Sequence, residues 1–273
     1  MKFLISNDDG VYALGLLALY QALSTIGEVV VVAPNSEQSG FSSALSVTTP
    51  LHTHQLPSGF IAVNGSPADC IYLALHELYQ DTHFDCVITG INSGANLGQD
   101  VMFSGTFGAA LTAQLSGIPA IATSLVGAGS KGEEHVGHYQ IAANEIVKLL
   151  KETSILDICK NLPYHVLNVN IPNVDKADEI KGRKITSLGH RQVAHPVQHI
   201  VDPRGRDAYW LSLRKSQHEL SETKTDHQSQ NVPSSVVKLT DDQAVAAGYI
   251  SLSPVRLHHT PVESLDKLSA LVL

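Results

Sequence analysis

Apolar runs alternate with amphipathic segments through the first part of the chain. Strand-like runs rich in β-branched residues lie at residues 2–6, 28–33, 60–63, 84–89 and 118–124. Helical spacing or a helix-start signal marks residues 13–26, 66–79, 105–115 and 138–151. Ser66 is the predicted cap of the second of these helices. The run EVVVVA at 28–33 is typical of a parallel strand that is covered on both faces. Together these patterns predict an α/β fold, doubly wound around a mostly parallel sheet.

The pattern is less regular after about residue 155. Further strands are predicted at 165–171 and 249–253, and helices at 241–247 and 262–271. Residues 184–188 and 209–213 are predicted to form a β-hairpin, and the polar tract at 214–235 to belong to an arm. We therefore expect a single domain over residues 1–273, with a Rossmann-like core at 1–155. The remaining strands, the C-terminal hairpin arm for oligomerisation and the terminal helix would occupy 156–273.

Composition narrows the classes of function. The 273 residues include 18 Lys and Arg against 26 Asp and Glu, which gives a formal net charge of −8. This balance disfavours a surface that coats a nucleic-acid polymer or an anionic membrane. Neither a signal peptide nor a membrane-spanning run is evident, so we expect a cytoplasmic protein. Cys70, Cys86 and Cys159 form no CxxC pair, and we expect reduced, mostly buried thiols.

An acidic pair follows the first predicted strand, in the sequence Asn7-Asp8-Asp9-Gly10. Ligands of doubly wound folds bind at this edge of the sheet, beyond the carboxyl ends of the strands. Adjacent carboxylates repel each other unless a cation lies between or beside them, so Asp8 and Asp9 are candidate ligands of a divalent ion. The same residues also make ordinary capping turns, and that structural alternative stays open.

Two later stretches should reach the same edge, one in the Gly- and Asn-rich loop predicted at 90–103 and one after the strand at 28–33. In GINSGANLG at residues 90–98, Asn92 offers a neutral oxygen suited to Mg²⁺ or Mn²⁺, and Asn96 offers an amide that can donate to a phosphate. Ser39 and Gly40 follow the strand at 28–33. A turn without any ligand would have a similar composition.

Ser104, Gly105 and Thr106 begin the helix predicted at 105–115. Backbone amides at a helix start, the helix dipole and two hydroxyls together make an anion site. The stretch lacks the Lys of a P-loop, which argues against an NTPase. A simple Ser cap is the alternative.

These motifs, taken in order, resemble the SurE family, the survival-protein-E nucleotidases. The resemblance spans nearly the whole chain, and the combination of motifs is far more specific than any one of them. It rests on ISNDDGVYALG (5–15), VVAPNSEQSGFSSALS (31–46), NGSPADC (64–70), GINSGANLGQDVMFSGTFGAA (90–110), DPRGRDAYW (202–210) and TDDQAVAAGYISLSP (240–254).

The resemblance implies a metal-dependent phosphatase with one divalent cation per subunit, Mg²⁺ or Mn²⁺. Its substrates would be nucleoside monophosphates with a 5′- or 3′-phosphate, and short polyphosphate. By motif, the metal ligands fall on Asp8, Asp9, Ser39 and Asn92. The phosphate contacts fall on Asn96, Ser104, Gly105 and Thr106, with Gly40 beside them. It also implies a homodimer or homotetramer that exchanges C-terminal segments.

The chain departs from the family at two positions of the first loop. Tyr12 and Leu14 stand where the family usually has His and Pro, and these changes could shift substrate preference near the rim of the site. The tract at 214–235 aligns with nothing we can identify.

Three rival interpretations remain. The GxGxxG pattern at 127–132 suggests a dinucleotide-binding oxidoreductase module, but it does not follow the first strand of the sheet. A metal-dependent nucleotide-sugar transferase would also use Asp8 and Asp9. Zinc sites could be formed by His135 with His138 or by His258 with His259, although no acid or Cys accompanies either pair.

Overall fold

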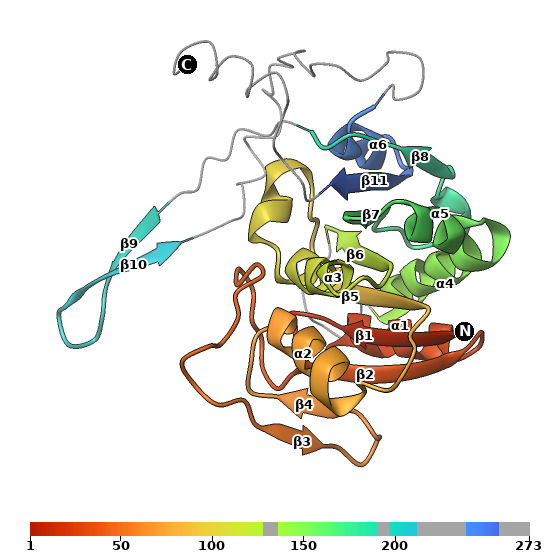
Figure 1. Ribbon diagram of the computed structural model, residues 1–273. Coiled ribbons are helices and arrows are strands. Elements are labelled where there is room, and N and C mark those ends of the chain that lie inside the picture. The colour runs from red at the N-terminus through yellow and green to blue at the C-terminus, as the bar shows by residue number, and fades with distance from the viewer. Residues whose placement is uncertain (128–135, 190–196, 212–238, 257–273) are drawn as a thin grey trace, which may run out of the picture.

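The computed structural model describes residues 1–127, 136–189, 197–211 and 239–256. These residues form a nine-stranded sheet and a separate two-stranded hairpin (Figure 1). The strands of the sheet are β1 (Lys2–Ser6), β2 (Glu28–Pro34), β3 (Thr53–Gln55), β4 (Ile61–Val63), β5 (Cys86–Ser93), β6 (Ala120–Val126), β7 (His165–Pro172), β8 (Arg183–Ile185) and β11 (Ile250–Arg256). The hairpin consists of β9 (Val197–Val201) and β10 (Asp207–Leu211).

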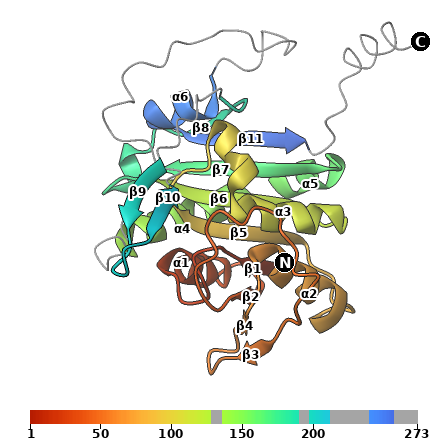
Figure 2. The same cartoon turned by 90° about the vertical axis from the view of Figure 1, so that its left-hand side faces the viewer.

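The order across the sheet is β3-β4-β2-β1-β5-β6-β7-β11-β8 (Figure 2). All neighbouring strands from β4 to β7 are parallel, and β8 is parallel to β11. Among the described strands of this sheet, only the β3–β4 and β7–β11 pairs are antiparallel. The predicted α/β fold with a mostly parallel sheet is therefore confirmed. Since β7, β11 and β8 belong to it, the sheet continues beyond residue 155.

Helices cover both faces of the sheet. They are α1 (Leu14–Leu23), α2 (Pro67–Leu73), α3 (Gly105–Leu115), α4 (Val136–Glu152), α5 (Ile155–Asn161) and α6 (Asp241–Ala246). Short turns of other helix types are η1 (Ala74–Leu78), η2 (Gly98–Phe103) and η4 (Ala177–Glu179). The helix predicted at 66–79 is α2 followed by η1, and its predicted Ser cap is confirmed, because Ser66 and Asp69 form a capping box.

Successive residues of each central strand point into different hydrophobic cores. Phe3 and Ile5 of β1 lie in the core covered by α1 and α4, whereas Leu4 lies in the core covered by α2 and α3. Val31 and Val32 of β2 divide in the same way. This alternation explains why the central strands are apolar at every position.

The strand order reverses beside β1. From β1 the chain crosses through α1 to β2 on one side, while from β5 it crosses through α3 to β6 on the other side. Helices α1 and α3 lie on opposite faces. The carboxyl ends of β1 and β5 thus border a topological switch point, where doubly wound sheets bind their ligands.

The predicted hairpin of residues 184–188 with 209–213 is wrong. The first segment is β8, which joins the edge of the sheet beside β11, and the second overlaps β10, which pairs with β9. A tight turn decides this pairing, because Gly205 donates its N–H to the Asp202 carbonyl at 2.9 Å and adopts a φ of +76°. The sequence Asp-Pro-Arg-Gly before β10 is a turn signal that would have located the true partner strand.

The segment 90–103, predicted as a loop, is also more ordered than expected. β5 continues to Ser93, and η2 forms at Gly98–Phe103. The pairing with β6 is irregular between Thr89 and Asn92 and then resumes, with Asn92 opposite Ser124. The glycines of GINSGANLG indicated this irregularity. The pairing that resumes after it depends on β6, so the local sequence does not predict it.

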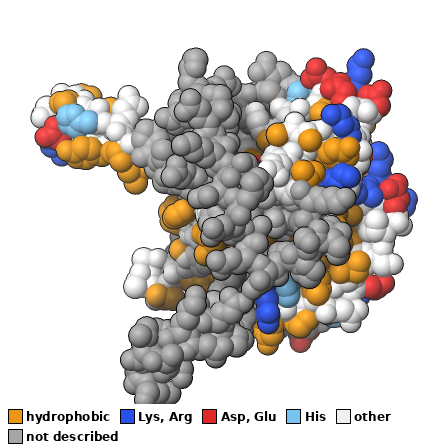
Figure 3. Space-filling view, turned by 90° about the horizontal axis from the view of Figure 1, so that it is seen from above, with side chains coloured by type: hydrophobic (Ala, Val, Ile, Leu, Met, Phe, Trp, Pro, Cys, Tyr) orange, Lys and Arg blue, Asp and Glu red, His pale blue; other side chains and the backbone are white. Residues whose placement is uncertain are grey.

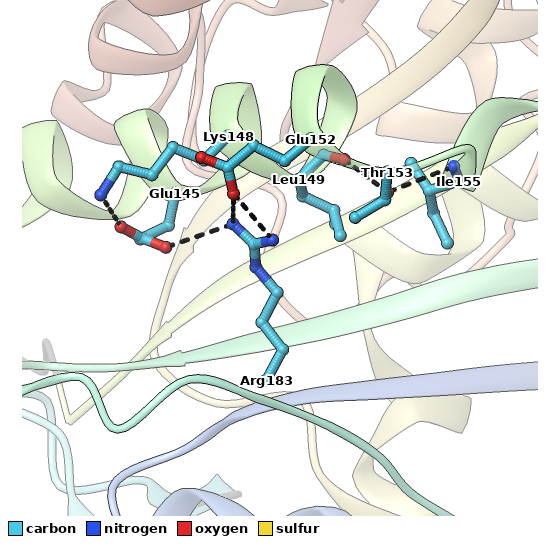
Figure 4. A network of polar contacts seen from close by, with 7 residues as sticks. All are labelled: Glu145, Lys148, Leu149, Glu152, Thr153, Ile155 and Arg183. Atoms are coloured by element: carbon cyan, nitrogen blue, oxygen red, sulfur yellow. Dashed lines mark hydrogen bonds and ion pairs between the residues drawn. The ribbon is translucent and has the colours of Figure 1, made fainter.

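A network of charged side chains ties the edge strand β8 to α4 (Figure 4). The Arg183 guanidinium lies 3.6 Å from Glu145 and 3.3 Å from Glu152. Lys148 reaches Glu145 at 2.5 Å. Because the Glu145 side chain is only 10% exposed, these cations offset the loss of its hydration.

The hairpin projects away from the sheet and carries hydrophobic side chains (Figures 1 and 3). Tyr209 and Trp210 are each 65% exposed, so neither packs in the core.

Cys70, Cys86 and Cys159 are free and buried, as predicted. Within the described ranges, no helix combines the length and apolar character needed to cross a membrane. The polar tract at 214–235 and the helix predicted at 262–271 lie outside the described residues.

Candidate active site

The Asp8–Asp9 turn is fixed by its own neighbours. The Asn7 side chain donates to the Gly10 carbonyl at 3.0 Å, and Gly10 has a φ of +100°. The Val11 N–H then donates to the Pro34 carbonyl at 2.8 Å, which joins the turn to the end of β2. The two carboxylates are thus held at the switch point.

Asp8 points toward the start of α3. Its side chain is buried and accepts a hydrogen bond from the Thr106 hydroxyl. Gly105 allows the close approach, because a Cβ there would lie 2.9 Å from the Asp8 Cβ. Burial, and then the neighbouring charge of Asp9, raise the pKa of Asp8 to about 7.

Asp9 points instead toward the end of β5. Its Oδ2 accepts the Ser93 N–H at 3.0 Å. Asn92, the preceding residue, donates its side-chain N–H to the Gly94 carbonyl at 2.9 Å. This bond fixes the amide so that Oδ1 remains an acceptor. The structure therefore brings the ends of β1 and β5 into direct contact.

The loop after β2 lies against the same turn, because Gln38 donates its N–H to the Asp8 carbonyl at 2.7 Å. Ser39 is exposed, and its hydroxyl donates to Glu37 at 2.9 Å. Its oxygen keeps lone pairs for a cation. Glu37 was missed from the sequence, although its charge contributes to raising the pKa of Asp8. A Cβ at Gly40 would meet no atom within 4 Å, so this glycine faces open space.

The start of α3 has features of both an anion site and a simple Ser cap, the two interpretations of its sequence. Ser104 caps the helix by accepting the Phe107 N–H at 3.0 Å. The Thr106 hydroxyl is engaged by Asp8, so it positions that carboxylate in this structure. The first turn of α3 nevertheless places the positive end of its dipole beside the acidic turn, as an anion site requires.

Asn96 is held by a buried amide network. Its N–H donates to Asn170 at 2.9 Å, and its carbonyl accepts N–H groups from Asn168 and Asn170 at 2.9 and 3.0 Å. Its own side chain donates to Ser124 at 2.8 Å, which leaves its second amide hydrogen for another acceptor. Asn168 and Asn170 were missed because residues 165–171 were predicted only as a strand, with no functional residue in it. Their alternation in HVLNVNI was the available signal.

Asp241, at the start of α6, joins the C-terminal part of the chain to this loop. Its two carboxylate oxygens accept the N–H groups of Gly98 and Gly189, each at 2.8 Å. Asp241 is fully buried, and desolvation raises its pKa although these bonds oppose the shift. The sequence predicts only a helix start at this position.

The oxygen donors near the turn suit a hard divalent cation. Two carboxylates, an amide oxygen and a hydroxyl match the ligands of Mg²⁺ or Mn²⁺. The charges that shift the pKa of Asp8 are those of Asp9 and Glu37, both negative. A cation would relieve this repulsion, so the residues present fit such an ion.

The zinc and dinucleotide interpretations gain no support. Over the described residues, no group of three or more His, Cys, Asp and Glu could hold a metal. His138 contacts Asn173 at 2.6 Å and Asp175 at 3.3 Å. His135, His258, His259 and most of the GxGxxG pattern lie outside the described residues.

Comparison with known proteins decides the family. The model of the family described as Survival protein SurE matches residues 3–195. The chain belongs to the SurE family. A protein of Psychrobacter cryohalolentis named 5′-nucleotidase SurE is 76% identical, and the match covers 100% of both chains. One of the same name from Acinetobacter baylyi is 43% identical, also over 100% of both.

A SurE crystal structure is similar throughout. The SurE protein of Aquifex aeolicus shares 33% identity and a TM-score of 0.77, over 99% of each chain. At this identity the agreement supports both the α/β fold and the family assignment. The resemblance drawn from sequence motifs is therefore confirmed.

Proposed function

We propose that this chain hydrolyses nucleoside monophosphates to a nucleoside and phosphate, as a divalent-metal-dependent 5′-nucleotidase. The contact between Asp8 and Thr106 carries this proposal, because it joins the acidic turn to the helix start suited to an anion. The SurE relatives bear the name 5′-nucleotidase. A second activity on 3′-nucleotides and on short polyphosphate is part of the proposal. Residues that contact only the terminal phosphate do not discriminate between the groups to which that phosphate is attached.

The proposed ion is Mg²⁺ or Mn²⁺, one per subunit, held by Asp8, Asp9, Asn92 and Ser39. Bound there, such an ion would supply positive charge for the phosphate and would lower the pKa of a water molecule, the nucleophile for an in-line displacement at phosphorus. Asp8 and Asp9 act as ligands rather than as bases, because a carboxylate bound to a cation is a weak base.

The remaining residues position these groups. Thr106 holds the Asp8 carboxylate, and the Ser93 N–H holds that of Asp9. The backbone amides of Gly105 and Thr106 and the hydroxyl of Ser104 are proposed to bind phosphate oxygens, with Asn96 donating its second amide hydrogen. The Ser104 N–H already donates to the Val101 carbonyl at 3.3 Å. No covalent intermediate on the protein is required.

The exposed hairpin supports a homodimer or homotetramer in which C-terminal segments pass to a neighbouring subunit. Five of its apolar side chains are at least half exposed, namely Val197, Val201, Tyr209, Trp210 and Leu211, while Ile200 and Ala208 are partly buried. Hydrophobic surface on a projecting arm is stabilised by burial in a partner. Light scattering of the full chain tests this assembly, and a monomer would contradict it.

Phosphate release tests the function. Chelator-treated protein should be inactive on AMP and should recover activity with Mn²⁺ or Mg²⁺. Asp9→Asn should lose at least about a hundredfold in kcat, while Asp178→Asn, a control at an exposed position, should not. Near-normal turnover by Asp9→Asn would contradict the ligand assignment. Absence of phosphate release under every metal condition would contradict the proposed function and favour a transferase.

A further inference from the structure

A cavity of about 270 Å³ lies against Asp9, on the face of the sheet covered by α1 and α4. Residues 10–15, which lead from the acidic turn into α1, form much of its wall. Pockets for small organic ligands commonly measure about 300–1,000 Å³. The cavity therefore has room for one compact organic group directly beside a candidate metal ligand.

The inner wall of the cavity is fixed relative to Asp9. Tyr139 of α4 lines the cavity and is only 3% exposed. Ser93 lines the same cavity, and its N–H donates to the Asp9 carboxylate at 3.0 Å. A group bound here would thus have a defined distance to the carboxylates, as a leaving group must have.

Tyr12 adds an exposed aromatic ring to the wall of the cavity, in contrast to the buried Tyr139. It lines the same space but is 69% exposed, so its ring contributes little to the core. A large exposed aromatic residue beside an apolar cavity is typical of a binding surface. Asn35 and Ser36 add amide and hydroxyl groups at the end of β2.

We propose that this cavity binds the nucleoside part of the substrate, with the base stacked on Tyr12. This inference rests on the proposed function. A nucleoside is compact, has a flat aromatic face for Tyr12, and has polar edges that Asn35 and Ser36 can meet. Its ester oxygen leads to the phosphate, which belongs at the carboxylates. Because stacking tolerates different bases, the site distinguishes nucleotides from base-free phosphate esters more strongly than one base from another.

Substrate selectivity tests the stacking role. The ratio of kcat/KM for AMP to that for ribose 5-phosphate should fall about tenfold in Tyr12→Ala. Tyr12→Phe keeps the ring face and should retain the ratio. Tyr72→Ala is the matched control, because Tyr72 is a half-exposed tyrosine of α2 outside the cavity. An unchanged ratio in Tyr12→Ala would overturn the inference.

Binding of adenosine to metal-free protein provides a second measurement that needs no turnover. Saturation-transfer NMR should show affinity reduced about tenfold in Tyr12→Ala and retained in Tyr12→Phe. Equal binding by Tyr12→Ala and the parent chain would exclude the site. Adenosine binding that depends on Tyr12, without any hydrolysis of AMP, would support the cavity assignment while refuting the proposed function.

Discussion

The Thr106 hydroxyl donates a hydrogen bond to the Asp8 carboxylate across 98 residues of sequence. Asp8 follows β1, and Thr106 lies in the first turn of α3. Their contact joins the two halves of the switch point. Asp9, one residue later, makes its contact with Ser93 instead. The adjacent acids therefore organise two different walls of one site.

Thr106→Val should reduce kcat/KM for AMP by about 10–100-fold, because the buried carboxylate of Asp8 loses its hydrogen-bond donor. The substitution nearly preserves shape. Thr112→Val is the control, since that buried hydroxyl of α3 donates only within the helix, to the Gly108 carbonyl at 2.9 Å. Steady-state kinetics of both variants check the prediction. Equal losses of kcat/KM in the two variants would contradict a specific role of the Thr106–Asp8 contact, because any replacement of a buried threonine in α3 would then have the same effect.

Gly15→Ala should lower the free energy of unfolding by about 3 kcal/mol. A Cβ at Gly15 would lie 2.0 Å from the Ile91 carbonyl oxygen, where α1 meets β5. At Gly137 of α4 a Cβ meets nothing within 4 Å, so Gly137→Ala should change stability by at most about 1 kcal/mol, in the stabilising direction. Urea unfolding measures both. A stable Gly15→Ala protein would mean that α1 shifts freely on the sheet.

Asp241→Asn should destabilise the protein by about 1–3 kcal/mol, because an amide group would face one of the N–H donors of Gly98 or Gly189. Gly98 begins η2, which leads to the start of α3, so activity should also fall. Asp178→Asn, at an exposed position, serves as the control. Thermal unfolding and AMP hydrolysis provide the readouts, and normal values in both would remove Asp241 from the support of the site.

Arg183→Met should lower the free energy of unfolding by about 1–3 kcal/mol, since it leaves Glu145 with Lys148 as its cationic partner. The change keeps the apolar stem of the side chain. Lys176→Met replaces an exposed cation and should have little effect. Urea denaturation compares the two variants, and similar stabilities would indicate that the network of Figure 4 contributes nothing measurable.

The amino-acid sequence by itself determined the parallel α/β core, because the apolar runs of its central strands are local signals. Short-range signals also located the Ser66 cap, the start of α3 and the acidic turn at Asp8 and Asp9. The partner predicted for β10 was wrong because the Asp-Pro-Arg-Gly turn before this strand was overlooked, whereas the pairing of β8 with β11 joins distant segments that no local pattern encodes.

Only the tertiary structure decided how these residues combine. Neighbouring aspartates face different walls because Thr106 lies in the first turn of α3, on one face of the sheet, whereas Ser93 lies at the end of β5, within the sheet. The buried partners of Asn96, the link from Asp241 to Gly98 and the cavity beside Asp9 each require elements far apart in the chain. Periodicity reports which residues are buried, whereas the contacts of a buried polar group depend on the packing of the whole domain.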